Sequence, residues 1–244
     1  MHFGILVFPG TNCERDTLHV VRDVLGHTGA LVWHDSHDLS PFDGVIIPGG
    51  FAHGDYLRTG AVARYSPIMD SVAEFAHNGK PVLGICNGFQ ILCEAGLLPG
   101  VLRRNYTSLF ICRDAFVRVE DNRNAFLHEL NLGNILKMPV RHGEGCYTVD
   151  DDTLSDMERG GQVVLRYVNR RGDLDEGANP NGSVSNIAGV CNERGNVLGL
   201  MPHPEAASEL ILGSNDGLAL FAGMTRALNE GRARTADLDP MMAL

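Results

Sequence analysis

The chain has 244 residues and a formal net charge of −10 at pH 7, and this length can bury a large core in one α/β domain or two small ones. The acidic balance argues against a nucleic-acid-binding function, which needs a basic face, and no apolar run reaches the roughly 18 residues of a membrane span. The six cysteines form no C-x-x-C pair and no signal peptide precedes the first predicted strand, so we expect a cytoplasmic protein without a disulfide framework or a zinc knuckle.

The first part of the chain alternates between short apolar runs and helical stretches. The predicted elements are, in chain order, a strand at 3–8, a helix at 12–25, strands at 31–33 and 43–47, a helix at 61–78, a strand at 82–85 and a helix at 89–95. Gly26 and Gly79 stand where the first two helices are expected to end. Strands that alternate with helices of this length favour a parallel sheet that is covered on both faces.

The pattern changes between about residue 101 and residue 190, where turns and acidic loops separate the apolar runs. Strands are predicted at 116–119, 137–140 and 163–168, followed by a strand at 196–201 and a closing helix at 216–229. We interpret the changed region as a mixed-strand extension of the same sheet, so the fold class is a flavodoxin-like, mostly parallel α/β sheet with helices on both faces. Residues 1–230 are expected to form one domain, and residues 231–244 a tail without a motif.

Two polar segments in this region are expected to lie in loops. The run Asp150–Asp152 is interpreted as a solvated acidic loop, because a calcium site would need a longer pattern of acidic residues. Residues 172–182 are rich in turn-forming residues, which predicts a mobile surface loop.

Cys86 lies in the pattern G-x-C-x-G, between a predicted buried strand and a predicted helix. This is the thiol version of the nucleophile elbow, a tight turn that pushes its side chain out of the sheet in a strained conformation. Gly84 and Gly88 leave room for the neighbouring backbone, and the helix N-terminus favours the thiolate. Free cysteines are more often plain core residues, but the strand before Cys86 and the helix after it favour a nucleophile.

A nucleophilic thiol needs a base, and the base needs a group that orients it. His203 follows the predicted strand at 196–201 and stands between two prolines, so its backbone is expected to be extended. Glu205 lies two residues further on, where its carboxylate can fix the tautomer of the imidazole. The same tripeptide would fit a solvated loop, but catalytic groups in open α/β sheets gather at strand carboxyl ends. Together with Cys86, His203 and Glu205 therefore predict a catalytic triad.

These motifs, G-I-C-N-G-F-Q and M-P-H-P-E, resemble the Cys and His-x-Glu elements of the class I (triad) glutamine amidotransferases. Further stretches resemble one branch of that family, the glutaminase subunit of phosphoribosylformylglycinamidine synthase; they are residues 8–13, 47–58, 142–145 and 181–183. The similarity runs to about residue 227, while residues 114–137 and 166–178 fit less tightly and hold no catalytic position.

The resemblance implies that the chain hydrolyses L-glutamine and passes the ammonia to a partner, which would convert formylglycinamide ribonucleotide to the amidine in purine biosynthesis. The implied partners are a large synthetase subunit and a small accessory subunit, and the implied contact to bound glutamine is Gln90. No ATP-binding motif is visible, so ATP and Mg would be used by the partner, with no cofactor on this chain. The cysteine spacing is wrong for zinc, and we expect no metal.

Three further residues are candidates for the glutamine site on their own sequence context. Gly50, in the loop after the strand at 43–47, could contribute half of an oxyanion hole, with the Asn87 amide as the other half. The alternative for Gly50 is a plain tight turn. His142 follows a predicted strand and could line the pocket, although a solvated loop explains it nearly as well.

Two functions from other classes are alternatives. One is a cysteine peptidase or chaperone-like stress protein on the same scaffold, and Glu205 placed two residues after His203 favours the amidotransferase over it. The other is a regulatory or binding subunit without activity, and the presence of Cys86 with both partner residues argues against that.

Overall fold

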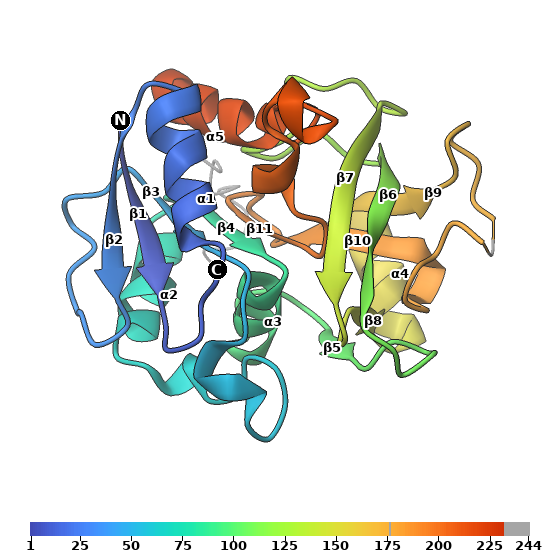
Figure 1. The fold of residues 1–244 in the computed structure, drawn as a ribbon, viewed down its shortest axis with the longest axis horizontal. Coiled ribbons are helices and arrows are strands. Elements are labelled where there is room, and N and C mark those ends of the chain that lie inside the picture. Colours follow the sequence, from blue (N-terminus) through green and yellow to red (C-terminus); the bar gives the residue numbers. More distant parts are fainter. Residues whose placement is uncertain (176, 232–244) are drawn as a thin grey trace, which may run out of the picture.

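In the computed structural model, which describes residues 1–175 and 177–231, nine strands form one sheet in the order β2-β1-β3-β4-β11-β10-β9-β6-β7 (Figure 1). The first five strands in this order are mutually parallel. Their bounds are β1 (His2–Val7), β2 (Thr28–Trp33), β3 (Gly44–Ile47), β4 (Val82–Ile85) and β11 (Val197–Leu200). Strand order 2-1-3-4-5 is that of the flavodoxin-like fold, so the predicted fold class is confirmed.

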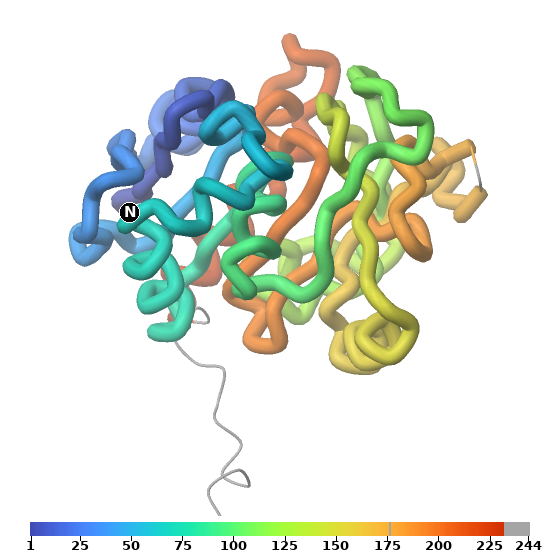
Figure 2. The backbone as a smooth tube through the Cα atoms, turned by 90° about the horizontal axis from the view of Figure 1, so that it is seen from below, coloured from blue at the N-terminus to red at the C-terminus, as the bar shows by residue number. Residues whose placement is uncertain are grey.

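Helices cover both faces of the parallel strands, as the alternation in the sequence predicts (Figures 1 and 2). Glycines in the sheet let the helices pack closely: Gly44 leaves room for Met224 of α5, and Gly84 leaves room for Leu92 of α3 on the opposite face. The helices are α1 (Glu14–His19), continued by a π-helical turn (Val20–Val24), α2 (Ile68–His77), α3 (Asn87–Glu94), α4 (Asp151–Gly160) and α5 (Leu218–Glu230). Short 3-10 turns are Ala52–Asp55, Ala63–Tyr65, Val184–Asn186, Pro204–Ala207 and Leu210–Leu212.

The predicted mixed extension is present and continues the parallel sheet. β10 pairs antiparallel with β11, and β9, β6 and β7 follow with antiparallel pairing throughout. The extension strands are β6 (Ile111–Val119), β7 (Ile135–His142), β9 (Val163–Val168) and β10 (Ile187–Cys191), while β5 (Val101–Arg103) and β8 (Cys146–Thr148) form a separate two-stranded sheet. Because backbone hydrogen bonds join the extension to β11, it shares one sheet with the catalytic strands.

Two predicted elements are wrong in detail, and both errors have a local cause. The helix predicted at 61–78 begins only at Ile68, because Pro67 stands at its N-cap and holds Ser66 extended, with ψ 139°. The segment Asp150–Asp152 is not a loop but opens α4. Asp150 is the N-cap of this helix, and its side chain accepts a hydrogen bond from the Thr153 amide at 2.9 Å.

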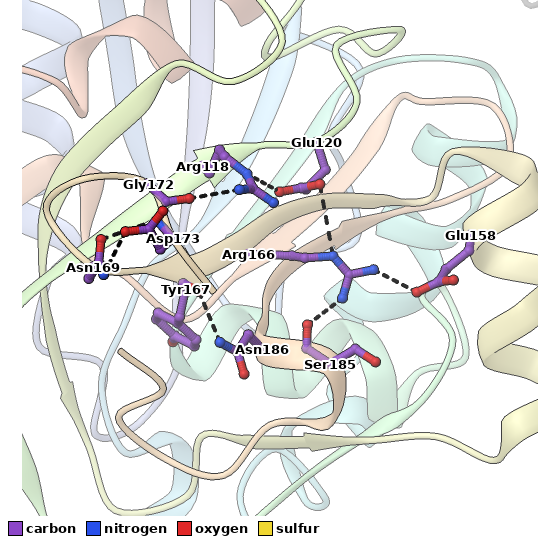
Figure 3. Close-up of polar contacts among 10 residues, drawn as sticks. All are labelled: Arg118, Glu120, Glu158, Arg166, Tyr167, Asn169, Gly172, Asp173, Ser185 and Asn186. Carbon is purple, nitrogen blue, oxygen red and sulfur yellow. Dashed lines mark hydrogen bonds and ion pairs between the residues drawn. The ribbon is translucent and has the colours of Figure 1, made fainter. Parts of the chain in front are cut away.

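The turn-rich segment at 172–182 has no helix or strand in its described residues, but its beginning is anchored to the sheet (Figure 3). Arg118 of β6 donates a hydrogen bond to the carbonyl of Gly172 at 2.7 Å. Arg166 of β9 forms ion pairs with Glu120 after β6, at 4.0 Å, and with Glu158 of α4, at 2.6 Å. These contacts tie the helix, the loop and the extension strands together.

The described part of the chain ends just after α5. Gly231 ends α5 in a left-handed conformation, and residues 232–244 of the predicted tail lie outside the described residues. Within the described ranges, we find no helix of sufficient length and apolarity to span a membrane.

Candidate active site

Cys86 lies between the last residue of β4 and the first residue of α3 and has the strained backbone that the motif predicts. Its φ is 50° and its ψ is −103°, outside the regions that residues with a side chain normally adopt. The Cys86 amide donates to the carbonyl of Leu200 in β11 at 2.8 Å, which fixes the turn. A Cβ on Gly88 would lie 1.9 Å from the carbonyl oxygen of Ile47, so only glycine permits this close packing.

His203 and Glu205 form a buried pair beyond the end of β11. His203 is extended, with φ −103° and ψ 92°, and its amide donates to the carbonyl of Pro139 at 2.8 Å. The imidazole Nδ1 lies 2.6 Å from Glu205 Oε1, and both residues are 2% exposed. This bond fixes the proton on Nδ1 and leaves Nε2, which has no partner among the described residues, free for proton transfer.

Gly49 brings the thiol and the base together. A Cβ on this residue would lie 2.8 Å from Cε1 of His203 and 3.5 Å from Cβ of Cys86. The two side chains therefore flank the same glycine. The Cys86 sulfur also lies 3.7 Å from the carbonyl oxygen of Arg141 in β7. The three residues predicted as a triad thus lie around one point at the carboxyl edge of the sheet.

Electrostatics favour the ion-pair form of His203 and Glu205. Burial alone would lower the pKa of His203, but the Glu205 charge and the nearby thiols raise it well above its ordinary value. Burial would likewise raise the pKa of Glu205, yet the adjacent His203 lowers it. An imidazolium in this position can give a proton to a leaving group.

Cys13 is a second thiol at the site, and its sequence context alone does not single it out. Its sulfur lies 3.9 Å from Nδ1 of His203, and burial raises the pKa of the thiol. The available signal was its place in residues 8–13, one of the stretches that carried the family resemblance. Cys13, His203 and Glu205 offer ligand atoms within 4.8 Å of one another, a donor set that zinc accepts. A metal bound there through Nδ1 of His203 would take the place of the hydrogen bond between this nitrogen and Glu205.

The loop after β3 lies against the elbow. A Cβ on Gly50 would lie 2.7 Å from the backbone nitrogen of Asn12, so the position has space only for glycine. The Gly49 carbonyl accepts hydrogen bonds from the amides of Asn12 and Cys13 at 3.1 and 3.0 Å. Asn87, the first residue of α3, accepts a hydrogen bond on Oδ1 from the Ala52 amide at 3.0 Å. Asn87 therefore follows Cys86 directly, and Gly50 follows Gly49, whose Cβ position lies 3.5 Å from Cβ of Cys86.

Gln90 and His142 are also buried beside the elbow. Gln90 accepts a hydrogen bond from the Asn87 side chain at 2.9 Å and donates one to the carbonyl of Glu144. His142 ends β7 and is 3% exposed, so the solvated-loop alternative is wrong. Burial, with His203 nearby, lowers the pKa of His142 to about 3, which keeps its imidazole neutral. Asn181 contacts this ring, and sequence analysis found it only as part of the resemblance.

Comparison with known proteins shows the class to which this fold and site belong. A family model described as a CobB/CobQ-like glutamine amidotransferase domain matches residues 1–216. A solved glutamine amidotransferase from Thermotoga maritima has the same fold, with a TM-score of 0.55 and 17% identity over 96% of this chain and 99% of that chain.

More similar relatives show the branch. A phosphoribosylformylglycinamidine synthase subunit PurQ from Nostoc sp. is 53% identical over 92% of this chain and 96% of its own length. A chain in the structure of PurLQS from Thermotoga maritima is 41% identical, with a TM-score of 0.82 over 93% of this chain and 98% of that chain. The chain therefore belongs to the glutamine amidotransferase family and, within it, to the PurQ family of phosphoribosylformylglycinamidine synthase subunits.

Proposed function

We propose that this chain hydrolyses L-glutamine to glutamate and ammonia and supplies the ammonia to a synthetase that makes formylglycinamidine ribonucleotide in purine biosynthesis. The observation that carries the proposal is the strained Cys86 beside the buried pair of His203 and Glu205. Membership of the PurQ family supports the choice of substrate and pathway.

The geometry supports a thioester mechanism. The Cys86 thiolate attacks the side-chain carboxamide carbon of glutamine, and the amides of Gly50 and Asn87 stabilise the oxyanion; loss of one such donor typically costs about 10²–10³ in rate. His203, oriented by Glu205, donates its proton to the departing ammonia. His203 then takes a proton from a water molecule that cleaves the thioester, which releases glutamate and restores the Cys86 thiolate beside a protonated His203. Gln90 and His142 are proposed to contact the bound glutamine.

An exposed apolar surface beside the site supports docking of the synthetase there. Leu57, in the loop that follows Gly50, is 91% exposed, and Phe51 in the same loop lies near Phe110, with ring centroids 6.5 Å apart. Exposed apolar surface of this kind is typical of protein interfaces. We propose that the large synthetase subunit covers this surface, that a small accessory subunit completes the complex, and that ATP and Mg bind to the partner. The complex is proposed to be cytoplasmic.

The test combines the purified chain with its synthetase and compares glutamine with added ammonia as nitrogen donor. Cys86→Ala and His203→Ala should abolish the glutamine-dependent reaction and spare the ammonia-dependent one. Cys191→Ala is the matched control, because this sulfur lies 3.9 Å from the carbonyl of Gly161, away from the elbow. Glutamine-dependent turnover near that of the wild type in Cys86→Ala would reject the proposal.

A second experiment identifies the nucleophile directly. A glutamine-mimicking diazo-ketone should label Cys86 alone among the six cysteines. Peptide mapping that finds the label on Cys13 or Cys146, with Cys86 unmodified, would contradict the assignment.

A further inference from the structure

Asn181 faces the His142 imidazole with a defined end of its carboxamide. The Asn181 Nδ2 lies 3.1 Å from His142 Nε2. The Asn181 Oδ1 accepts a hydrogen bond from the Ser183 amide at 3.1 Å, and the Ser183 hydroxyl lies 2.7 Å from this oxygen and 3.2 Å from the Gly145 carbonyl. Because a backbone amide can only donate, the oxygen must face the Ser183 amide, and the amine end must face the ring and donate to it. His142 Nε2 is therefore an acceptor and carries no proton.

This contact decides where the proton of His142 lies. The ring is neutral, since burial lowers its pKa to about 3. A neutral imidazole with a lone pair on Nε2 carries its proton on Nδ1. The Nδ1 atom is buried and has no partner among the residues that the structure describes. A buried N–H without an acceptor is destabilising, so a bound ligand is the natural source of its acceptor.

The backbone that carries His142 lies beside the nucleophile. The residue before it, Arg141, has its carbonyl oxygen 3.7 Å from the Cys86 sulfur. The His142 carbonyl accepts a hydrogen bond from the buried Asn105 side chain at 2.9 Å, which fixes this backbone. The turn that follows is held by Gln90, whose side chain donates to the carbonyl of Glu144. The imidazole is thus fixed at the edge of the nucleophile's site.

Packing alone already fixes the position of the ring. A Cβ on Gly145 would lie 2.2 Å from His142 Nε2, so the imidazole fills the space that a side chain at this glycine would need. What the Asn181 contact adds is the choice between the two tautomers of a ring that is already in place.

We propose that Asn181 is a positioning residue for glutamine, because it holds His142 in the tautomer whose Nδ1–H donates a hydrogen bond to an oxygen of the bound substrate. The inference rests on the proposed glutaminase function. It adds a polar relay from the loop at 179–183, far from the elbow in sequence, to the substrate.

The first test reads the tautomer without any need for activity. Long-range ¹H–¹⁵N spectra of the wild-type chain, with His142→Asn used for assignment, should show a neutral ring protonated on Nδ1. In Asn181→Asp the ionised carboxylate can only accept a hydrogen bond, so at about pH 9 the neutral ring should carry its proton on Nε2 and donate it to this carboxylate. A wild-type ring protonated on Nε2 would overturn the inference and leave the glutaminase proposal untouched.

The second test asks whether Asn181 acts through His142. Asn181→Asp should raise the KM for glutamine about tenfold or more at this pH, with little effect on ammonia-dependent synthesis. His142→Asn places an amide N–H near the position of Nδ1 and has no tautomers, so Asn181→Asp should add less than about twofold in that background. An equal rise of KM in both backgrounds would mean a structural role only and would refute the proposal.

Discussion

Gly49→Ala is the perturbation that tests the geometry of the site most directly. The added methyl group would lie 2.8 Å from Cε1 of His203 and 3.3 Å from the sulfur of Cys13. Gly49 is not among the glycines with a positive φ, so alanine imposes no backbone strain there. The effect of the substitution is therefore confined to the side chains around the catalytic point.

The expected magnitude follows from that contact. Carbon atoms pack at about 3.5–4.0 Å, so the imidazole must move by roughly 1 Å. It cannot move freely, because Glu205 holds Nδ1 at 2.6 Å and the ring is buried. A misplacement of about 1 Å at a reacting group can cost about 10²-fold in rate, or roughly 2.7 kcal/mol of transition-state stabilisation.

The assay is steady-state glutamine hydrolysis by the complex, with ammonia-dependent synthesis measured on the same samples. We expect kcat/KM for glutamine to fall about 10²-fold while the ammonia reaction is retained. The matched control is Gly160→Ala at the end of α4, where the nearest atom to the new Cβ lies at 3.5 Å and no loss is expected. A kcat/KM within about threefold of wild type, in a variant with unchanged melting temperature, would refute this account of the site.

Three more predictions concern the base, a half-buried carboxylate and metals. Glu205→Gln should lower glutamine turnover by about 10²-fold or more but less than Cys86→Ala, since Glu205 only orients the base; equal losses in the two variants would contradict this. Burial and then Glu144 raise the pKa of Asp55 to about 6, so the folded chain loses stability as the pH rises from about 4 to 6. Asp55→Asn should remove this loss and raise the free energy of unfolding by about 1 kcal/mol near pH 8, with no difference below about pH 4. Denaturant titrations that find no pH-dependent difference between the variant and the wild type would count against this prediction. Dialysis against a chelator should leave glutamine hydrolysis unchanged, and a stoichiometric zinc ion whose removal abolishes activity would overturn the metal-free mechanism.

Local patterns were enough to predict the parallel half of the fold. Apolar runs such as residues 82–85 are bounded by turns and helices, so their secondary structure depends little on distant contacts. The same local information failed where tertiary packing or a cap decides. α4 has Met157 as its single fully buried residue and an acidic first turn, so its sequence resembles a solvated loop, and the structure shows the Asp150 cap that starts the helix.

The sequence by itself determined the identity of the chemical groups, because Cys86 and the pair of His203 and Glu205 each lie in a short motif that fixes their backbone locally. Only the tertiary structure decided which other groups join them. Cys13 contacts His203, which is 190 residues away in the sequence, and Asn181 contacts His142, which is 39 residues away. Such long-range contacts depend on the order of strands in the sheet, which places β11 beside β4 and the extension strands next to β11. Strand order is set by the packing of the whole core, and no local motif encodes it.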